Sequence, residues 1–121
     1  MSVEGLRDAS PVKLVVGAVT DVGRSRDHNE DAFLVWNLKA GQAPLGLERA
    51  GTFSDEDGIV MAVCDGMGGA AAGERASAIA VDTLASRSAR LGSDLLGRPD
   101  EFGDWLCGSV TEADRRILDE A

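Results

Sequence analysis

Carboxylates at the ends of apolar segments are the residues in this chain best suited to chemistry. Asp65 follows the unbroken apolar segment Ile59–Cys64, while Glu30 and Asp31 come directly before a second apolar segment. A carboxylate at the end of a buried strand is held on a rigid element, as a metal ligand or catalytic group must be. Hard cations such as Mg²⁺ and Mn²⁺ prefer carboxylate, carbonyl and water oxygens. Gly66, which lacks a side chain, could turn its carbonyl toward the same ion, although Asp-Gly is also a common turn pair.

The polar segment "GRSRDHNEDAF" at 23–33 supplies the remaining candidates. The guanidinium of Arg26 can bind two phosphate oxygens at once. The alternative interpretation is a solvated charged loop in which Asn29 is a turn residue. His28 is the single histidine of the sequence and has a side chain suited to proton transfer. A lone histidine in a loop is nevertheless more often incidental than catalytic.

The glycine-rich stretch "GMGGAAAG" at 66–73 does not match the known phosphate-binding loops. It lacks the G-x-x-x-x-G-K-[ST] pattern, and it also lacks the third glycine and the context of a dinucleotide-binding G-x-G-x-x-G loop. These glycines are therefore better explained by a tight passage from the segment ending at Asp65 into a following helix.

Composition restricts the function further. The chain has 121 residues and a formal net charge of -9, from 21 acids and 12 bases. This length is typical of one domain, and the acidic balance argues against a nucleic-acid-binding protein. The N-terminus has no signal-peptide pattern, and no apolar run approaches the roughly 18 residues of a membrane span. Cys64 and Cys107 have no metal-ligand spacing, so we expect reduced, buried thiols in a cytoplasmic protein.

The hydrophobic pattern predicts three strands followed by two helices. We expect strands at 12–21, 32–36 and 59–64, with a long hairpin connection at 37–58. A helix is expected from Glu74 and a second one over 99–119, separated by the break at 91–99. The first should bury Ala76, Ile79, Ala80, Thr83 and Leu84, and the second Phe102, Trp105, Leu106, Val110, Ala113 and Ile117.

The continuous apolar run at 59–64 predicts a strand that is covered on both faces. Three strands and two helices do not offer an obvious second covering layer. We therefore expect that the unit either dimerises or forms the front part of a larger domain.

Two blocks of the sequence, taken together, resemble one known family. "TDVGRSRDHNEDAF" at 20–33 and "VMAVCDGMGGAAAGERAS" at 60–77 are similar to the PP2C-type (PPM) metal-dependent protein serine/threonine phosphatases in their bacterial form. The family pattern has a D-x-G-x-x-R-x-x-N-E-D block and then a strand that ends in D-G-M-G-G-x-x-x-G-E-x-A-S. Every fixed position of both blocks is present, and a weaker similarity continues to about Leu84.

The resemblance implies a centre of two Mn²⁺ or Mg²⁺ ions. Asp65 would bridge the two ions, the carbonyl of Gly66 would bind one of them, and Glu30 would hold a metal-bound water. Asp31 and Asn29 would support these ligands from the second layer. The family's other metal-binding carboxylates belong to later motifs that are not found after Leu84, so residues outside this chain would complete the centre.

The resemblance also implies the reaction and the substrates. Arg26 would bind the phosphate of phosphoserine or phosphothreonine in proteins that are substrates of serine/threonine kinases. A hydroxide bridging the two metals would attack phosphorus in line, with Arg26 and the metals offsetting the growing charge. Some family members have a histidine where this chain has Met67, so water or His28 would protonate the leaving group, and we favour water.

The family fold is α+β, a four-layer α-β-β-α sandwich of two antiparallel sheets flanked by helices. Residues 1–121 would form the N-terminal portion of one such domain, incomplete in this chain, with the motif-bearing core at about 12–90 and the second helix at about 99–119. The alternative is a truncated, catalytically inactive PPM-like module that binds a phosphopeptide or a partner protein.

Overall fold

A computed structural model of the chain describes residues 12–24, 29–39, 49–54, 58–66, 70–92 and 94–120. These residues form an α+β fold of two antiparallel sheets and two long helices. None of the helices in these ranges is long and apolar enough to cross a membrane. The elements in chain order are β1 Lys13–Ala18, β2 Asp31–Asn37, β3 Arg49–Ser54, β4 Ile59–Asp65, α2 Ala70–Leu91 and α3 Pro99–Glu120.

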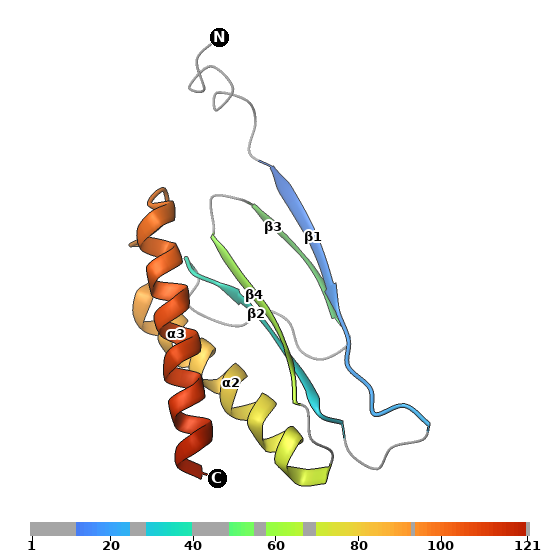
Figure 1. Cartoon of the computed structure of the whole chain (residues 1–121). Coiled ribbons are helices and arrows are strands. Elements are labelled where there is room, and N and C mark those ends of the chain that lie inside the picture. The colour runs from blue at the N-terminus through green and yellow to red at the C-terminus, as the bar shows by residue number, and fades with distance from the viewer. Residues whose placement is uncertain are drawn as a thin grey trace.

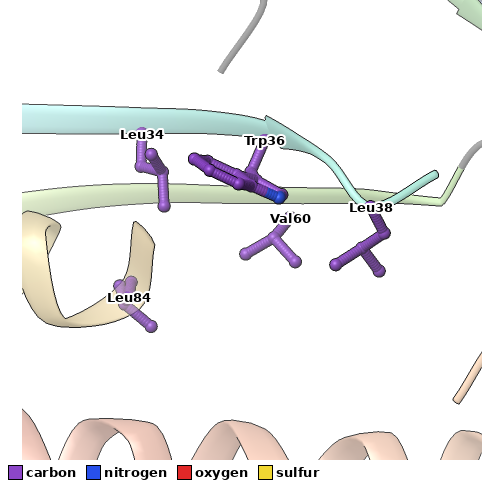
Figure 2. Close-up of a cluster of buried hydrophobic side chains, with 5 residues drawn as sticks. All are labelled: Leu34, Trp36, Leu38, Val60 and Leu84. Atoms are coloured by element: carbon purple, nitrogen blue, oxygen red, sulfur yellow. The ribbon is translucent and has the colours of Figure 1, made fainter. Parts of the chain in front are cut away.

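The central sheet consists of β2 and β4. The two strands pair antiparallel, from Asp31 opposite Asp65 to Asn37 opposite Ile59. Alternate side chains turn toward the helices, and five buried side chains from this sheet, the turn after β2 and α2 form the core (Figure 2): Leu34, Trp36, Leu38, Val60 and Leu84. Residues expected to be strands at 32–36 and 59–64 are therefore confirmed, each extended by one or two residues.

Helix α2 covers one face of this sheet and contacts both β2 and β4 (Figure 1). Its predicted apolar stripe is confirmed, because Ile79, Thr83 and Leu84 are buried. The helix begins at Ala70, four residues before the expected start at Glu74. Gly92 follows its last residue with a φ of 60°, the left-handed conformation that commonly ends a helix at a glycine.

Helix α3 packs along α2 and begins at Pro99, as expected. Its buried face differs from the predicted one, because Leu106 and Val110 are exposed and Ser109 is fully buried. Phe102, Trp105 and Ala113 do face inward. The small side chains of Ser109 and Ala113 allow the close approach to α2, which turns the predicted apolar face partly toward solvent.

The second sheet pairs β1 with β3, antiparallel, from Lys13 opposite Ser54 to Ala18 opposite Arg49. Strand β3 lies inside the segment 37–58, which the sequence pattern predicts to be a connection without strands, so that prediction was wrong. The first strand is also shorter than the expected 12–21. In Figure 1 this sheet lies on the side of β2 and β4 that faces away from the helices.

The fold therefore has a helix layer and two sheet layers among the described residues. The prediction that β4 is covered on both faces was wrong: Val60 is buried, but Met61 is 59% and Val63 is 83% exposed. An open apolar cleft of about 200 Å³ separates the sheets here, lined by Val16, Gly17, Ala18, Phe33, Leu34, Val35, Met61, Ala62 and Val63. The second sheet leaves this part of β4 uncovered.

The two cysteines do not behave alike. Cys64 on β4 is half-buried and packs against the core, whereas Cys107 on α3 is exposed. The expectation of two buried thiols was therefore wrong for Cys107, because its position on α3 faces away from α2. Both thiols are free, as expected.

Candidate functional site

Asp31 and Asp65 face each other at the end of the central sheet. They are directly opposite partners in the antiparallel register of β2 and β4. The next pair along is hydrogen-bonded, because the Gly66 N–H donates to the Glu30 carbonyl oxygen at 2.9 Å. Asp31 and Asp65 therefore occupy a non-hydrogen-bonded position, where cross-strand side chains come closest. Both side chains are exposed, so two like charges are held side by side where solvent ions can reach them.

Gly66 lies at a junction between the end of β4 and the first turn of α2. A Cβ atom on Gly66 would lie 1.8 Å from the carbonyl oxygen of Gly73 and 2.7 Å from that of Glu30. A Cβ atom on Gly73 would lie 2.3 Å from the carbonyl oxygen of Gly66. Only glycine fits at these two positions, because the backbones touch without room for a side chain. The glycines thus bring the helix directly against the strand end that carries Asp65.

Glu30 is part of the same junction. It is 7% exposed, and its carboxyl carbon would be 3.0 Å from a Cβ atom on Gly73. Successive strand residues point to opposite faces, so Glu30 lies on the α2 side, whereas Asp31 lies on the side of the second sheet. The structure joins Glu30 to the Asp65–Gly66 turn through the backbone hydrogen bond and through the contact with Gly73.

Hydrogen bonds also fix the chain just before Asp31. The Asn29 side-chain amide donates to the Thr20 hydroxyl at 2.7 Å, and the Asp31 N–H donates to Asn29 Oδ1 at 3.1 Å. The Gly23 N–H donates to Asp21 Oδ1 at 3.2 Å and closes a local turn. The stretch that leaves β1 is therefore tied to the first residue of β2.

The predicted site residue Arg26 lies outside the described residues, as do His28 and Met67. Among the described residues, the structure brings together Asp31, Asp65, Gly66 and Glu30. Glu30 joins this group through its carbonyl oxygen, which accepts from the Gly66 N–H, and through its carboxyl group, which lies against Gly73. Sequence reasoning did not identify Gly73 and Thr20 as parts of the site. The signal for Gly73 was its fixed place in the second motif block, and Thr20 gave no signal apart from adjoining the first block.

The donor set of this cluster suits a hard divalent cation. Asp31 and Asp65 offer carboxylate oxygens, which Mg²⁺ and Mn²⁺ prefer. The neighbouring Cys64 packs against the core on the other face of the sheet, where burial raises the pKa of its thiol. Within the described ranges no three acidic, histidine or cysteine side chains converge on one point. The oxygen donors that the described residues bring together at this sheet end are therefore the two opposed carboxylates of Asp31 and Asp65.

Comparison of the chain with protein-family models, with curated proteins and with solved structures finds no significant match. The resemblance to the PPM phosphatases therefore depends on the two motif blocks alone.

Proposed function

We propose that this chain is the N-terminal portion of a PPM-type, metal-dependent protein serine/threonine phosphatase domain. The observation that carries the proposal is the opposition of Asp31 and Asp65, beside the close contact of Gly66 with Gly73. The first motif block contributes Asp31, and the second contributes Asp65, Gly66 and Gly73. Two sequence blocks that resemble the same family thus meet at one sheet end, as a shared site requires.

In this proposal each residue has a definite task. Asp65 would hold Mn²⁺ or Mg²⁺ together with the Gly66 carbonyl, and Glu30 would hold a metal-bound water, as the resemblance implies. Because Asp31 lies directly opposite Asp65, we assign its carboxylate to the metal as well, in place of the supporting role that the resemblance implies. When bound, the cations would supply an activated water and neutralise charge on the phosphoryl group. Arg26 binds the phosphate of the phosphoprotein substrate. Further carboxylates from outside residues 1–121 complete the metal site, and the layers seen here form part of the four-layer α-β-β-α sandwich.

Replacing Asp65 tests the proposal. In the full-length gene product, Asp65→Asn removes a charged ligand, so we expect Mn²⁺-dependent hydrolysis of a phosphothreonine peptide to fall by about 100-fold or more. Asp104→Asn, an exposed position on α3, is the matched control and should retain full activity. Initial rates over a Mn²⁺ titration provide the measurement. Unchanged turnover of Asp65→Asn at saturating Mn²⁺ would disprove the assignment of this residue.

The alternative function is a catalytically inactive module that binds a phosphopeptide or a partner protein. The observation in its favour is that only two carboxylates, Asp31 and Asp65, oppose each other in the described residues, which is too little charge for two dications. This alternative predicts no turnover at any Mn²⁺ concentration. It also predicts phosphopeptide binding, measurable by fluorescence anisotropy, that weakens when Arg26 is replaced by Ala.

A further inference from the structure

Two side chains hydrogen-bond to the main chain of Asp31, the first residue of β2. Because Asp31 and Asp65 form a non-hydrogen-bonded pair, the N–H and carbonyl groups of Asp31 point away from β4. The side chains of Asn29 and Thr20 hydrogen-bond to these two main-chain groups. Asn29 Oδ1 accepts from the Asp31 N–H at 3.1 Å, and the Thr20 hydroxyl donates to the Asp31 carbonyl oxygen at 3.5 Å.

These two side chains are also joined to each other. The amide of Asn29 donates to the Thr20 hydroxyl at 2.7 Å, and both residues are half-buried. Thr20 follows the end of β1, so its hydroxyl connects the second sheet to the first residue of the central sheet. Side-chain hydrogen bonds thus hold Asp31 where a neighbouring strand would otherwise do so.

We propose that Thr20 is a positioning residue for the metal site, which fixes the Asp31 main chain through Asn29 and so places the Asp31 carboxylate opposite Asp65. The proposal rests on the proposed function, since it concerns the same cation. Groups that hydrogen-bond to metal-binding residues commonly alter metal affinity by about 10–100-fold. Because Thr20 contacts the main chain of Asp31 and not its carboxylate, we expect its effect on metal affinity to lie near the lower end of that range.

The test compares hydroxyl removal with hydroxyl retention in the full-length gene product. Thr20→Val keeps the shape and removes the hydroxyl, whereas Thr20→Ser keeps the hydroxyl. Thr111→Val is the matched control, because Thr111 is an exposed α3 residue whose hydroxyl bonds only its own helix, at the Cys107 carbonyl. Mn²⁺ affinity is measured by titration calorimetry, and exchange of the Asp31 amide is measured by NMR in the metal-free protein.

We expect Thr20→Val to weaken Mn²⁺ binding by about tenfold and to accelerate exchange of the Asp31 amide. Thr20→Ser and Thr111→Val should remain within twofold of the wild type, by the same scale of effects. Wild-type affinity in Thr20→Val, or equal losses in Thr20→Val and Thr20→Ser, would overturn the proposal. Equal circular-dichroism melts for the variants exclude a general loss of fold.

A second variant, Asn29→Asp, keeps the test decisive if Thr20→Val does not fold. It adds a negative charge near the cation, which by simple attraction would tighten Mn²⁺ binding. It also removes the donor to Thr20, so the positioning proposal predicts weaker binding, and tighter binding would overturn it. If the wild type neither binds Mn²⁺ nor hydrolyses phosphopeptide, the proposed function fails and this proposal fails with it. If the wild type does both and Thr20→Val is unchanged, only the positioning role fails.

Discussion

Gly66 and Gly73 show how two missing side chains can define a site. Their backbones touch, with the Glu30 carboxyl against Gly73, so the helix start, the end of β4 and the beginning of β2 share one small volume. Neither glycine is among those with a positive φ. What requires glycine here is the lack of space, and a methyl group would push α2 away from the sheet end.

Alanine at position 73 should therefore be strongly destabilising. The new Cβ would overlap the Gly66 carbonyl oxygen at 2.3 Å, and a clash between backbones cannot be relieved by a rotamer change. We expect a loss of about 3 kcal/mol or more in the free energy of unfolding. Urea denaturation followed by circular dichroism measures it.

Gly103→Ala is the matched control for this prediction. Gly103 is also a helical glycine, and nothing lies within 4 Å of an added Cβ atom. Alanine there should stabilise the protein by about 0.5–1 kcal/mol, because it lowers the entropy of the unfolded chain and favours the helix. If Gly73→Ala were as well tolerated as Gly103→Ala, the proposed close contact of Gly66 with Gly73 would be disproved.

At the scale of elements, polar contacts fix α3 along α2. The Arg87 guanidinium donates to the buried Ser109 hydroxyl at 2.7 Å and lies over the Trp105 ring, 5.9 Å from its centre. At the other end Arg75, in the first turns of α2, makes two hydrogen bonds to the Glu120 carboxylate at the end of α3. This last pair holds α3 against the part of α2 that adjoins Gly73.

The Arg75–Glu120 pair should make part of the stability depend on pH. The hydrogen bond from Arg75 lowers the pKa of the Glu120 carboxyl below its ordinary value near 4.5. A lowered folded-state pKa contributes stability that is present above the unfolded-state pKa and is lost as pH falls through the folded-state value. Wild-type protein should therefore unfold at a higher urea concentration than Glu120→Gln at pH 7. The two midpoints should converge as the pH is lowered below about 4.

Because both side chains are substantially exposed, solvent screening keeps this effect small. The partner variant Arg75→Gln provides the control, since adding Glu120→Gln to it should cause no further pH-dependent loss. If the urea midpoints of the wild type and Glu120→Gln differed by the same amount at pH 7 and at pH 3, the pair would not titrate as expected.

Elements with dense apolar runs could be predicted from the sequence, while those that depend on distant partners could not. Strands β2 and β4 and the stripe of α2 followed directly from their patterns. Strand β3, "RAGTFS", has few strong strand formers, and it is a strand because β1 pairs with it. Asp65 could be placed at a strand end, but its opposition to Asp31 is a matter of register, which no local pattern contains.

At the scale of the whole molecule, the layers leave apolar surface uncovered. The helices bury one face of the central sheet, and the second sheet only partly covers the other. Val63 and Met61 on β4 remain exposed toward the cleft, and Val15 on the second sheet is 77% exposed. Each sheet has two strands, so both sheets also have free edges within the described part of the chain. Such edges and apolar faces favour association.

Residues 1–121 produced alone should therefore self-associate, and the melting temperature should rise with protein concentration over about a hundredfold range. Val63→Lys places a charge on the uncovered strand, so it should reduce both effects. Leu118→Lys makes the same charge change at a position on α3 that is 65% exposed, and it should associate like the wild type.

Sedimentation velocity measures the association, and melting curves measure its effect on the melting temperature. A monomeric wild type with a sharp, concentration-independent melt would contradict this prediction, and equal effects of the two lysines would assign association to net charge instead of the β4 surface.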